Sequence, residues 1–199
     1  MTGAHTEAAD VERVALKEWA VLVDAMARGD LIAMIRKGGI REHRAGFDVR
    51  HDRFLLYPTF FHEKLNELDA RFHPLLESAH ATRPPEGMIE IRYVANVAAV
   101  WQVVELDRLR AIDSEHGLTW GAVESRFRYR DDPRVHVVAM RIASLARVAT
   151  LPEARRYSGC VSWVKLDEDV RVSGATPVID DNVFAARMRA LQHSLGDSA

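Results

Sequence analysis

The feature that most restricts the fold is a long run of alternating apolar residues in the middle of the chain. From Ile89 to Val103, every second residue is apolar, and most of the residues between them are more polar. A period of two is typical of a β-strand with one buried face. The run is longer than the average strand of about 5–6 residues. It therefore predicts either one bent strand or two consecutive strands, and it places a sheet at the centre of the fold.

Shorter patterns predict the other elements. Apolar stretches bounded by turn residues predict strands at residues 31–35, 47–51, 54–57, 135–142 and 160–166. Helical spacing of apolar residues predicts helices at residues 10–28 and 59–79, a short helix after residue 119, and a C-terminal helix that starts at residue 180 or 181. Pro74 is expected to kink or split the second helix. Two prolines and a glycine predict a loop at Arg83–Gly87.

Together these elements predict an α+β fold with a curved, mostly antiparallel sheet of about five to seven strands. Helices are expected at the N-terminus, in the middle and at the C-terminus. A chain of 199 residues is long enough to bury one substantial core. We therefore expect a single globular domain over residues 10–195, with flexible tails at residues 1–9 and 196–199.

Charge and cysteine content exclude several classes of protein. The formal net charge is −2, so no global field attracts nucleic acid or an anionic membrane, and such a partner needs a local patch. The single cysteine, Cys160, excludes an intramolecular disulfide and a multi-cysteine zinc site. No apolar run is long enough to span a bilayer. We expect a cytoplasmic protein with no membrane partner, no metal and no cofactor.

A cationic segment in the first third of the chain is the strongest candidate for binding an anion. Residues 36–53 hold six cations against three acids, although the whole chain is slightly acidic. Two adjacent glycines in this segment can bring backbone N–H groups close to a phosphate. The candidate anion-binding or nucleic-acid-binding residues are Arg36, Lys37, Gly38, Gly39, Arg41, Arg44, Arg50 and Arg53. The alternative is a solvated hairpin whose arginines pair with neighbouring acids.

Histidines in the same region suggest a catalytic centre. His51 and His62 flank the predicted strand at residues 54–57, where a general base can lie at one end of the sheet. Glu42 and Lys37 complete this candidate catalytic set. Ordinary surface or capping histidines are the alternative. A restriction-type nuclease needs an acid two residues before a lysine, and none of the four lysines has one.

For two further groups of side chains, the sequence allows both a binding role and a structural role. Trp163 and Tyr157 are candidates for stacking on an unpaired base, with packing in the core as the alternative. Lys17 and Glu18, together with Lys37 and Glu42, are candidates for lining one polar pocket, with surface ion pairs as the alternative.

Four segments of the chain resemble an uncharacterised prokaryotic family. They read LKEW at residues 16–19, RKGGIRE at 36–42, FLLYPTFFH at 54–62 and YSGCVSW at 157–163. In this order they resemble the family called domain of unknown function 1802. The resemblance implies no established activity, and it implies an association of some members with restriction-endonuclease-type domains. By analogy, a small open barrel similar to PUA and ASCH domains is one version of the predicted fold.

These observations predict a nucleic-acid-associated binding module, in a restriction or defence context, whose partner is a nucleic acid or a nucleotide. One alternative is a hydrolase or nuclease that acts on a nucleotide or phosphorylated substrate. Another alternative is a regulatory subunit that binds a restriction-type enzyme. The sequence does not decide whether the protein is an enzyme.

Overall fold

A curved sheet forms the centre of the computed structural model, which describes residues 10–37, 51–61, 64–159 and 161–196. Within these residues, the strands are β1 (Val11–Trp19), β2 (Ala33–Arg36), β3 (Arg53–Thr59), β4 (Met88–Val103), β5 (Val135–Pro152), β6 (Trp163–Arg171) and β7 (Thr176–Pro177). The α-helices are α1 (Ala20–Ala27), α2 (His73–Ala81), α3 (Trp120–Phe127) and α4 (Asp181–Leu195). Short 3-10 helices lie at Ala70–Phe72, Leu106–Glu115, Tyr129–Asp131 and Arg155–Tyr157.

The strand order confirms the predicted fold class. The strands follow the order β2-β5-β4-β3-β1-β6, and β7 pairs with β5. Among the described strands, β1 and β3 are the only parallel pair, and all the other pairs are antiparallel. β4 is the predicted bent strand, because its register with β5 shifts between Ile91 and Tyr93 and again between Val97 and Ala99. Such irregularities bend a strand and increase its twist.

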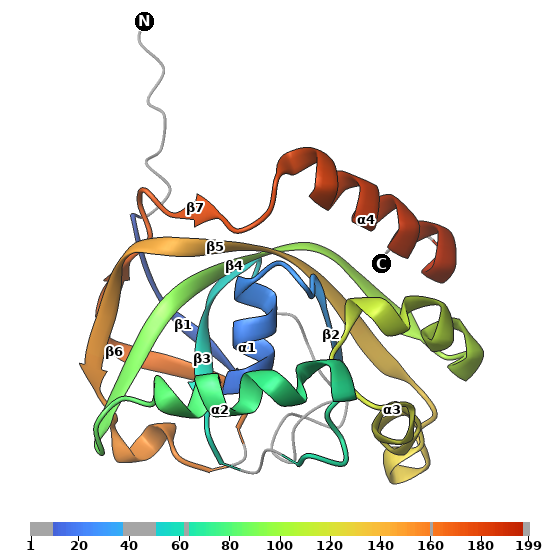
Figure 1. The fold of residues 1–199 in the computed structure, drawn as a ribbon, viewed down its shortest axis with the longest axis horizontal. Helices are drawn as coiled ribbons and strands as arrows, with labels where there is room; N and C mark the ends of the chain where they lie inside the picture. The colour runs from blue at the N-terminus through green and yellow to red at the C-terminus, as the bar shows by residue number, and fades with distance from the viewer. Residues whose placement is uncertain (1–9, 38–50, 62–63, 160, 197–199) are drawn as a thin grey trace, which may run out of the picture.

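The curvature of the sheet creates two hydrophobic clusters. One cluster contains Leu166 of β6 together with Ile89 of β4 and Leu151 of β5, although β6 lies three places from β4 in the strand order. The sheet therefore curls until its distant strands share a core. The larger cluster fills the other face, where α1 lies in the hollow of the sheet (Figure 1). Six of the eight residues of α1 are buried.

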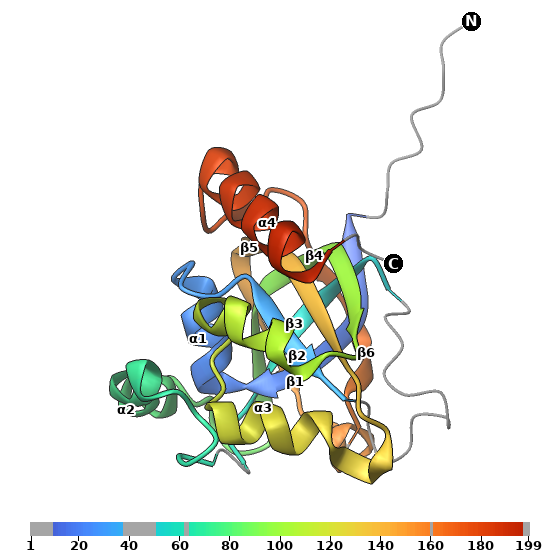
Figure 2. The same cartoon turned by 90° about the vertical axis from the view of Figure 1, so that its right-hand side faces the viewer.

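The remaining helices pack around this centre (Figures 1 and 2). α4 is fixed by Arg187, whose guanidinium donates to the Glu115 carboxylate at 2.6 Å and to the carbonyl of Asp30 at 2.8 Å. Side chains cap two of these helices at their N-termini, because Thr119 accepts from the backbone N–H of Ala122, and Asp180 accepts from that of Asn182. Among the described residues, no helix is both long and apolar enough to cross a membrane.

The predicted helix at residues 10–28 is wrong in its first half. Residues 11–19 form β1, and only Ala20–Ala27 are helical. β1 is buried on both faces, since Ala15 belongs to one hydrophobic cluster and Leu16 to the other. A strand with two buried faces has no clean alternation, and its apolar residues fit a helical period equally well.

The predicted helix at residues 59–79 is also wrong in its first part. The α-helix α2 starts only at His73, and Pro74 lies in its first turn, where a proline needs no hydrogen-bond donor. A 3-10 helix at Ala70–Phe72 precedes it, capped by the side chain of Asp69. Pro74 therefore helps to start α2 and does not kink a longer helix.

Candidate functional site

A deep cleft opens at one edge of the sheet, with a volume of about 900 Å³. Its walls come from residues 17–19 at the end of β1, 57–61 at the end of β3, 83–90 before and at the start of β4, and the segment before β6. Arg36, Arg126 and Glu153 complete the lining. The volume lies at the upper end of the range usual for small-molecule sites, which is about 300–1,000 Å³.

Strand direction explains why these segments meet. β1 and β3 are parallel neighbours, so their C-terminal ends reach the same edge, with Lys17 opposite Tyr57. β6 starts at this edge because it runs antiparallel to β1, and the N–H of Lys17 donates to the carbonyl of Ser162 at 2.9 Å. The hydroxyl of Thr59 donates to the carbonyl of Glu18 at 3.0 Å. The edge is therefore closed by hydrogen bonds between three segments.

Lys17 holds one wall of the cleft in place. Its ammonium donates to the carbonyl of Tyr157 and, at 3.3 Å, to that of Gly159. The same ammonium lies 5.5 Å from the centre of the Tyr57 ring, within the range of a cation–π contact. The segment before β6 is thereby fixed against the end of β1.

A hydrogen-bonded pair lies next to Lys17. The hydroxyl of Tyr57 donates to Oε1 of Glu153 at 2.7 Å. Burial raises the pKa of Tyr57 above its ordinary value, and the hydrogen bond to the Glu153 carboxylate raises this pKa further. The phenol therefore stays protonated at neutral pH, as a donor to the carboxylate must.

Arg36 joins two strands that are far apart in the strand order. Its guanidinium lies 3.0 Å from Oε2 of Glu18, and it donates to the carbonyl of Lys17 at 2.6 Å. Arg126 lies 5.7 Å from the Trp19 ring centre and 3.7 Å from Oε2 of Glu67. Burial lowers the pKa of Arg126, and the Glu18 carboxylate opposes this shift. The cleft thus places cations beside aromatic rings.

The entrance to the cleft carries an exposed aromatic ring and an arginine. Phe61 is 61% exposed, and the Arg83 guanidinium lies 4.7 Å from the centre of its ring. Arg83 also lies 5.7 Å from the centre of the Phe60 ring. No carboxylate among the described residues pairs with Arg83. This guanidinium is therefore available to an anionic ligand.

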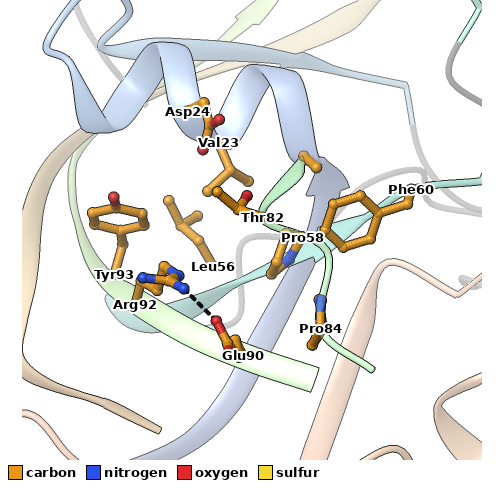
Figure 3. Close-up of a pocket in the computed structure, with 11 residues that line it drawn as sticks. Val23, Asp24, Leu56, Pro58, Phe60, Thr82, Pro84, Glu90, Arg92 and Tyr93 are labelled. Carbon is orange, nitrogen blue, oxygen red and sulfur yellow. Dashed lines mark hydrogen bonds and ion pairs between the residues drawn. The ribbon is translucent and has the colours of Figure 1, made fainter. Parts of the chain in front are cut away.

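A small recess adjoins the cleft and shares Pro58, Phe60, Pro84 and Glu90 with it (Figure 3). Its volume of about 20 Å³ has room for roughly one water molecule. Figure 3 shows Glu90 in an ion pair with Arg92 along one side of the recess. The recess is therefore an extension of the cleft and too small to be a second ligand site.

The structure places the described members of the cationic segment in different surroundings. Arg36 lines the cleft. Arg53, at the opposite end of β3, lies 3.3 Å from Oε2 of Glu12. Lys37 donates to main-chain carbonyls near the end of α3. The other candidates for anion binding or catalysis lie outside the described residues: Gly38, Gly39, Arg41, Glu42, Arg44, Arg50 and His62.

His51 and the predicted stacking residue Trp163 lie together, whereas the other predicted stacking residue, Tyr157, belongs to the second hydrophobic cluster. The ring of Trp163 has edge contacts with His51 at 5.3 Å and with Phe54 at 5.0 Å. Tyr157 is 2% exposed, and its hydroxyl accepts from the N–H of Asp167 at 2.7 Å. None of His51, Tyr157 or Trp163 is among the described residues that line the cleft. Their stacking and catalytic roles stay predictions.

Lys37 has a structural role that leads to a stability prediction. Its ammonium donates to the carbonyls of Phe127 at 3.2 Å, Arg134 at 2.8 Å and Asp132. Burial lowers its pKa, and Asp132 opposes the shift. Lys37→Met is expected to lower the free energy of unfolding by about 1–3 kcal/mol, because three carbonyls lose a charged donor. Urea denaturation measures this loss.

Lys165→Met is the matched control, because Lys165 is exposed on β6. It is expected to leave the unfolding midpoint in place. An unchanged midpoint for Lys37→Met would show that the three hydrogen bonds do not hold the end of α3.

Sequence reasoning missed three important residues of the cleft. Arg83 was part of a predicted loop, Phe61 part of a predicted helix, and Glu153 part of no pattern. The one sequence signal for Phe61 is its place as the second of two consecutive aromatic residues after a strand and a proline. The suggestion that Lys17 and Glu18 line a polar pocket agrees with their place in the cleft. Among the described residues, no group of three or more potential metal ligands comes together.

Comparisons with known proteins identify a family and two similar structures. The family model for domain of unknown function (DUF1802) matches residues 15–190. ASCH from Zymomonas mobilis is 12% identical, with a TM-score of 0.44 over 78% of this chain and 87% of that chain. A point mutant of the same protein has a TM-score of 0.45 at 12% identity over 80% and 91%. No curated protein matches the chain.

Proposed function

This chain belongs to the DUF1802 family, and we propose that it is a nucleic-acid-binding module whose cleft accepts one unpaired nucleotide. One observation carries the proposal. All four segments that carry the family resemblance contribute to the same cleft: Lys17–Trp19 from the first, Arg36 from the second, Tyr57–Phe61 from the third and residues 158–159 and 161–162 from the fourth. The convergence of these four segments on one cleft supports a binding site there.

The chemistry of the lining supports a nucleotide as the ligand. Trp19, Phe60 and Phe61 offer aromatic surface, on which bases stack with about 1–3 kcal/mol each. Arg83 supplies a guanidinium suited to a phosphate. Main-chain groups of the segment before β6 add polar atoms to the opposite wall.

The size of the cleft supports an unpaired nucleotide over a duplex. A volume of about 900 Å³ holds one nucleotide, whereas a base within a duplex is stacked and paired and cannot enter. The net charge of −2 also limits attraction to a long phosphate backbone, so the local arginines have to supply the affinity. No histidine is among the described residues that line the cleft, and we therefore base the proposal on binding.

The restriction-type partner and the cytoplasmic location stay predictions, because no contact within the described part of the chain bears on either.

Salt dependence and one arginine variant test the proposal. Fluorescence anisotropy is measured with labelled eight-nucleotide single-stranded DNA and RNA at 50 and 200 mM salt. Affinity is expected to fall with salt, because bound cations release counterions from the phosphates. Arg83→Ala is expected to weaken binding about 5- to 10-fold at the lower salt. It is also expected to reduce the slope of the logarithm of the binding constant against the logarithm of the salt concentration by about 0.7, which is the effect of one lost phosphate contact.

Arg189→Ala is the matched control, since Arg189 is an exposed arginine of α4 outside the cleft. It is expected to bind like the wild type. Absence of binding to both DNA and RNA, or equal affinity for Arg83→Ala and wild type, would remove the proposal.

A further inference from the structure

The cleft contains one carboxylate that is both oriented and available. The hydroxyl of Tyr57 fixes Oε1 of Glu153, and Oε2 of Glu153 has no hydrogen-bond partner among the described residues. The backbone N–H of Glu153 donates to the carbonyl of Gly87 at 2.7 Å, which ties it to the opposite segment of the lining. The carboxylate is therefore held at a fixed position on the wall of the cleft.

The other acids of the cleft differ from Glu153 in their partners. Glu18 uses one carboxylate oxygen for Arg36 and the other for the N–H of Trp19. Glu90 is paired with Arg92. Glu86 is exposed and has no residue that orients its carboxylate among the described residues. Glu153 alone among these four described acids combines an orienting donor with a free acceptor atom.

We propose that Glu153 selects guanine, by accepting hydrogen bonds from its N1–H and N2–H groups. This inference rests on the proposed function, because it concerns the base of the bound nucleotide. A carboxylate accepts two parallel hydrogen bonds from adjacent donors, as it does from arginine. Guanine is the standard base whose Watson–Crick edge presents two adjacent N–H donors.

The other bases fit this carboxylate less well. Adenine and cytosine each offer one amino group on this edge, beside a ring nitrogen that accepts and therefore repels a carboxylate oxygen. Thymine and uracil have one N–H flanked by two carbonyl oxygens, which face the carboxylate with like partial charge. Acceptors that face the carboxylate repel it, so the preference is for guanine over all four alternatives.

A set of oligonucleotides that differ at one position tests the inference. Anisotropy is measured with eight-nucleotide thymidine strands that hold one guanine, adenine or cytosine at a central position, and with the matching uridine strands of RNA. Wild-type protein is expected to bind the guanine strand at least about fivefold more tightly than the others, as for a good bidentate contact. Glu153→Gln is expected to reduce the preference to less than about twofold, because the amide presents a donor in place of one acceptor.

Two further variants separate orientation from charge. Tyr57→Phe removes the hydroxyl that orients the carboxylate, and it is expected to reduce the guanine preference while Glu153 is still present. Glu168→Gln removes an exposed acid of β6 that is not among the described residues lining the cleft, and it is expected to keep the preference. Glu153 is exposed, so its isosteric substitution leaves the folded structure intact, which circular dichroism verifies.

The outcomes distinguish this inference from the proposed function. Equal binding of all strands by the wild type, or a guanine preference that persists in Glu153→Gln, would overturn guanine selection and leave nucleotide binding standing. Absence of binding to every strand by the wild type would overturn the proposed function itself, and the selection with it.

Discussion

Replacing Phe61 and Arg83 together with alanine is expected to weaken the binding of single-stranded nucleic acid about 100-fold. Stacking of one base on an aromatic side chain contributes about 1–3 kcal/mol, and loss of the arginine adds the loss of a phosphate contact. Because the two side chains lie 4.7 Å apart in a cation–π contact, each also orients the other. Anisotropy with an eight-nucleotide strand at 50 mM salt measures the change.

The fold of this double variant is expected to be intact, because Phe61 is 61% exposed and Arg83 is also exposed. Tyr129→Ala combined with Arg189→Ala is the matched control. It removes one exposed aromatic ring and one exposed arginine that are not among the described lining of the cleft. Wild-type affinity is expected for this control. An equal loss of affinity in both double variants would mean that general surface charge, and not the entrance of the cleft, binds the strand.

Sequence patterns predicted the elements whose signals are local. The alternation from Ile89 to Val103 became β4, with bends at its two register shifts. α3 and α4 start directly after Thr119 and Asp180, because a side-chain oxygen of each of these N-cap residues accepts from a free backbone N–H. β1 could not be predicted in this way, because its strand conformation depends on pairing with β3 and β6 and not on the spacing of its own apolar residues.

The candidate site could be predicted only in part, because it depends on contacts between distant segments. Arg36 was a candidate from charge alone, but its meeting with Glu18 requires the sheet to bring β2 close to β1. Glu153 meets Tyr57 across a separation of 96 residues. No local pattern marks such a pair. Sequence reasoning therefore found residue types suited to a nucleotide, whereas the strand order determined which of them share a cleft.

The chain is also expected to lose stability in acid through one buried histidine. His116 is 1% exposed, its Nδ1 accepts from the N–H of Leu118 at 3.2 Å, and its Nε2 lies 3.8 Å from Oδ1 of Asp113. Burial lowers the pKa of His116 to about 4, and the Asp113 carboxylate only partly offsets this effect. Charges on Arg71 and Arg126 lower the pKa further, and Asp69 raises it.

The direction of the effect follows from proton binding in the two states. The unfolded chain protonates a histidine near pH 6.5, whereas the folded chain keeps His116 neutral down to about pH 4. Between these values the unfolded state binds the additional proton, so stability falls as the pH falls. This difference of about 2.5 units between the two pKa values corresponds to about 3 kcal/mol of unfolding free energy. That contribution is present above pH 6.5 and lost by pH 4.

Urea denaturation at pH 7, 6, 5 and 4 tests this expectation with wild type, His116→Gln and His193→Gln. Other groups titrate in all three proteins, so the informative quantity is the difference in unfolding free energy between wild type and His116→Gln. This difference is expected to shift by about 3 kcal/mol in favour of the variant from pH 7 to pH 4, because glutamine binds no proton. His193 is exposed on α4, and its variant is expected to follow the wild type at every pH. A constant difference for His116→Gln would mean that the folded protein accommodates the charged imidazolium, and that Asp113 compensates for its burial.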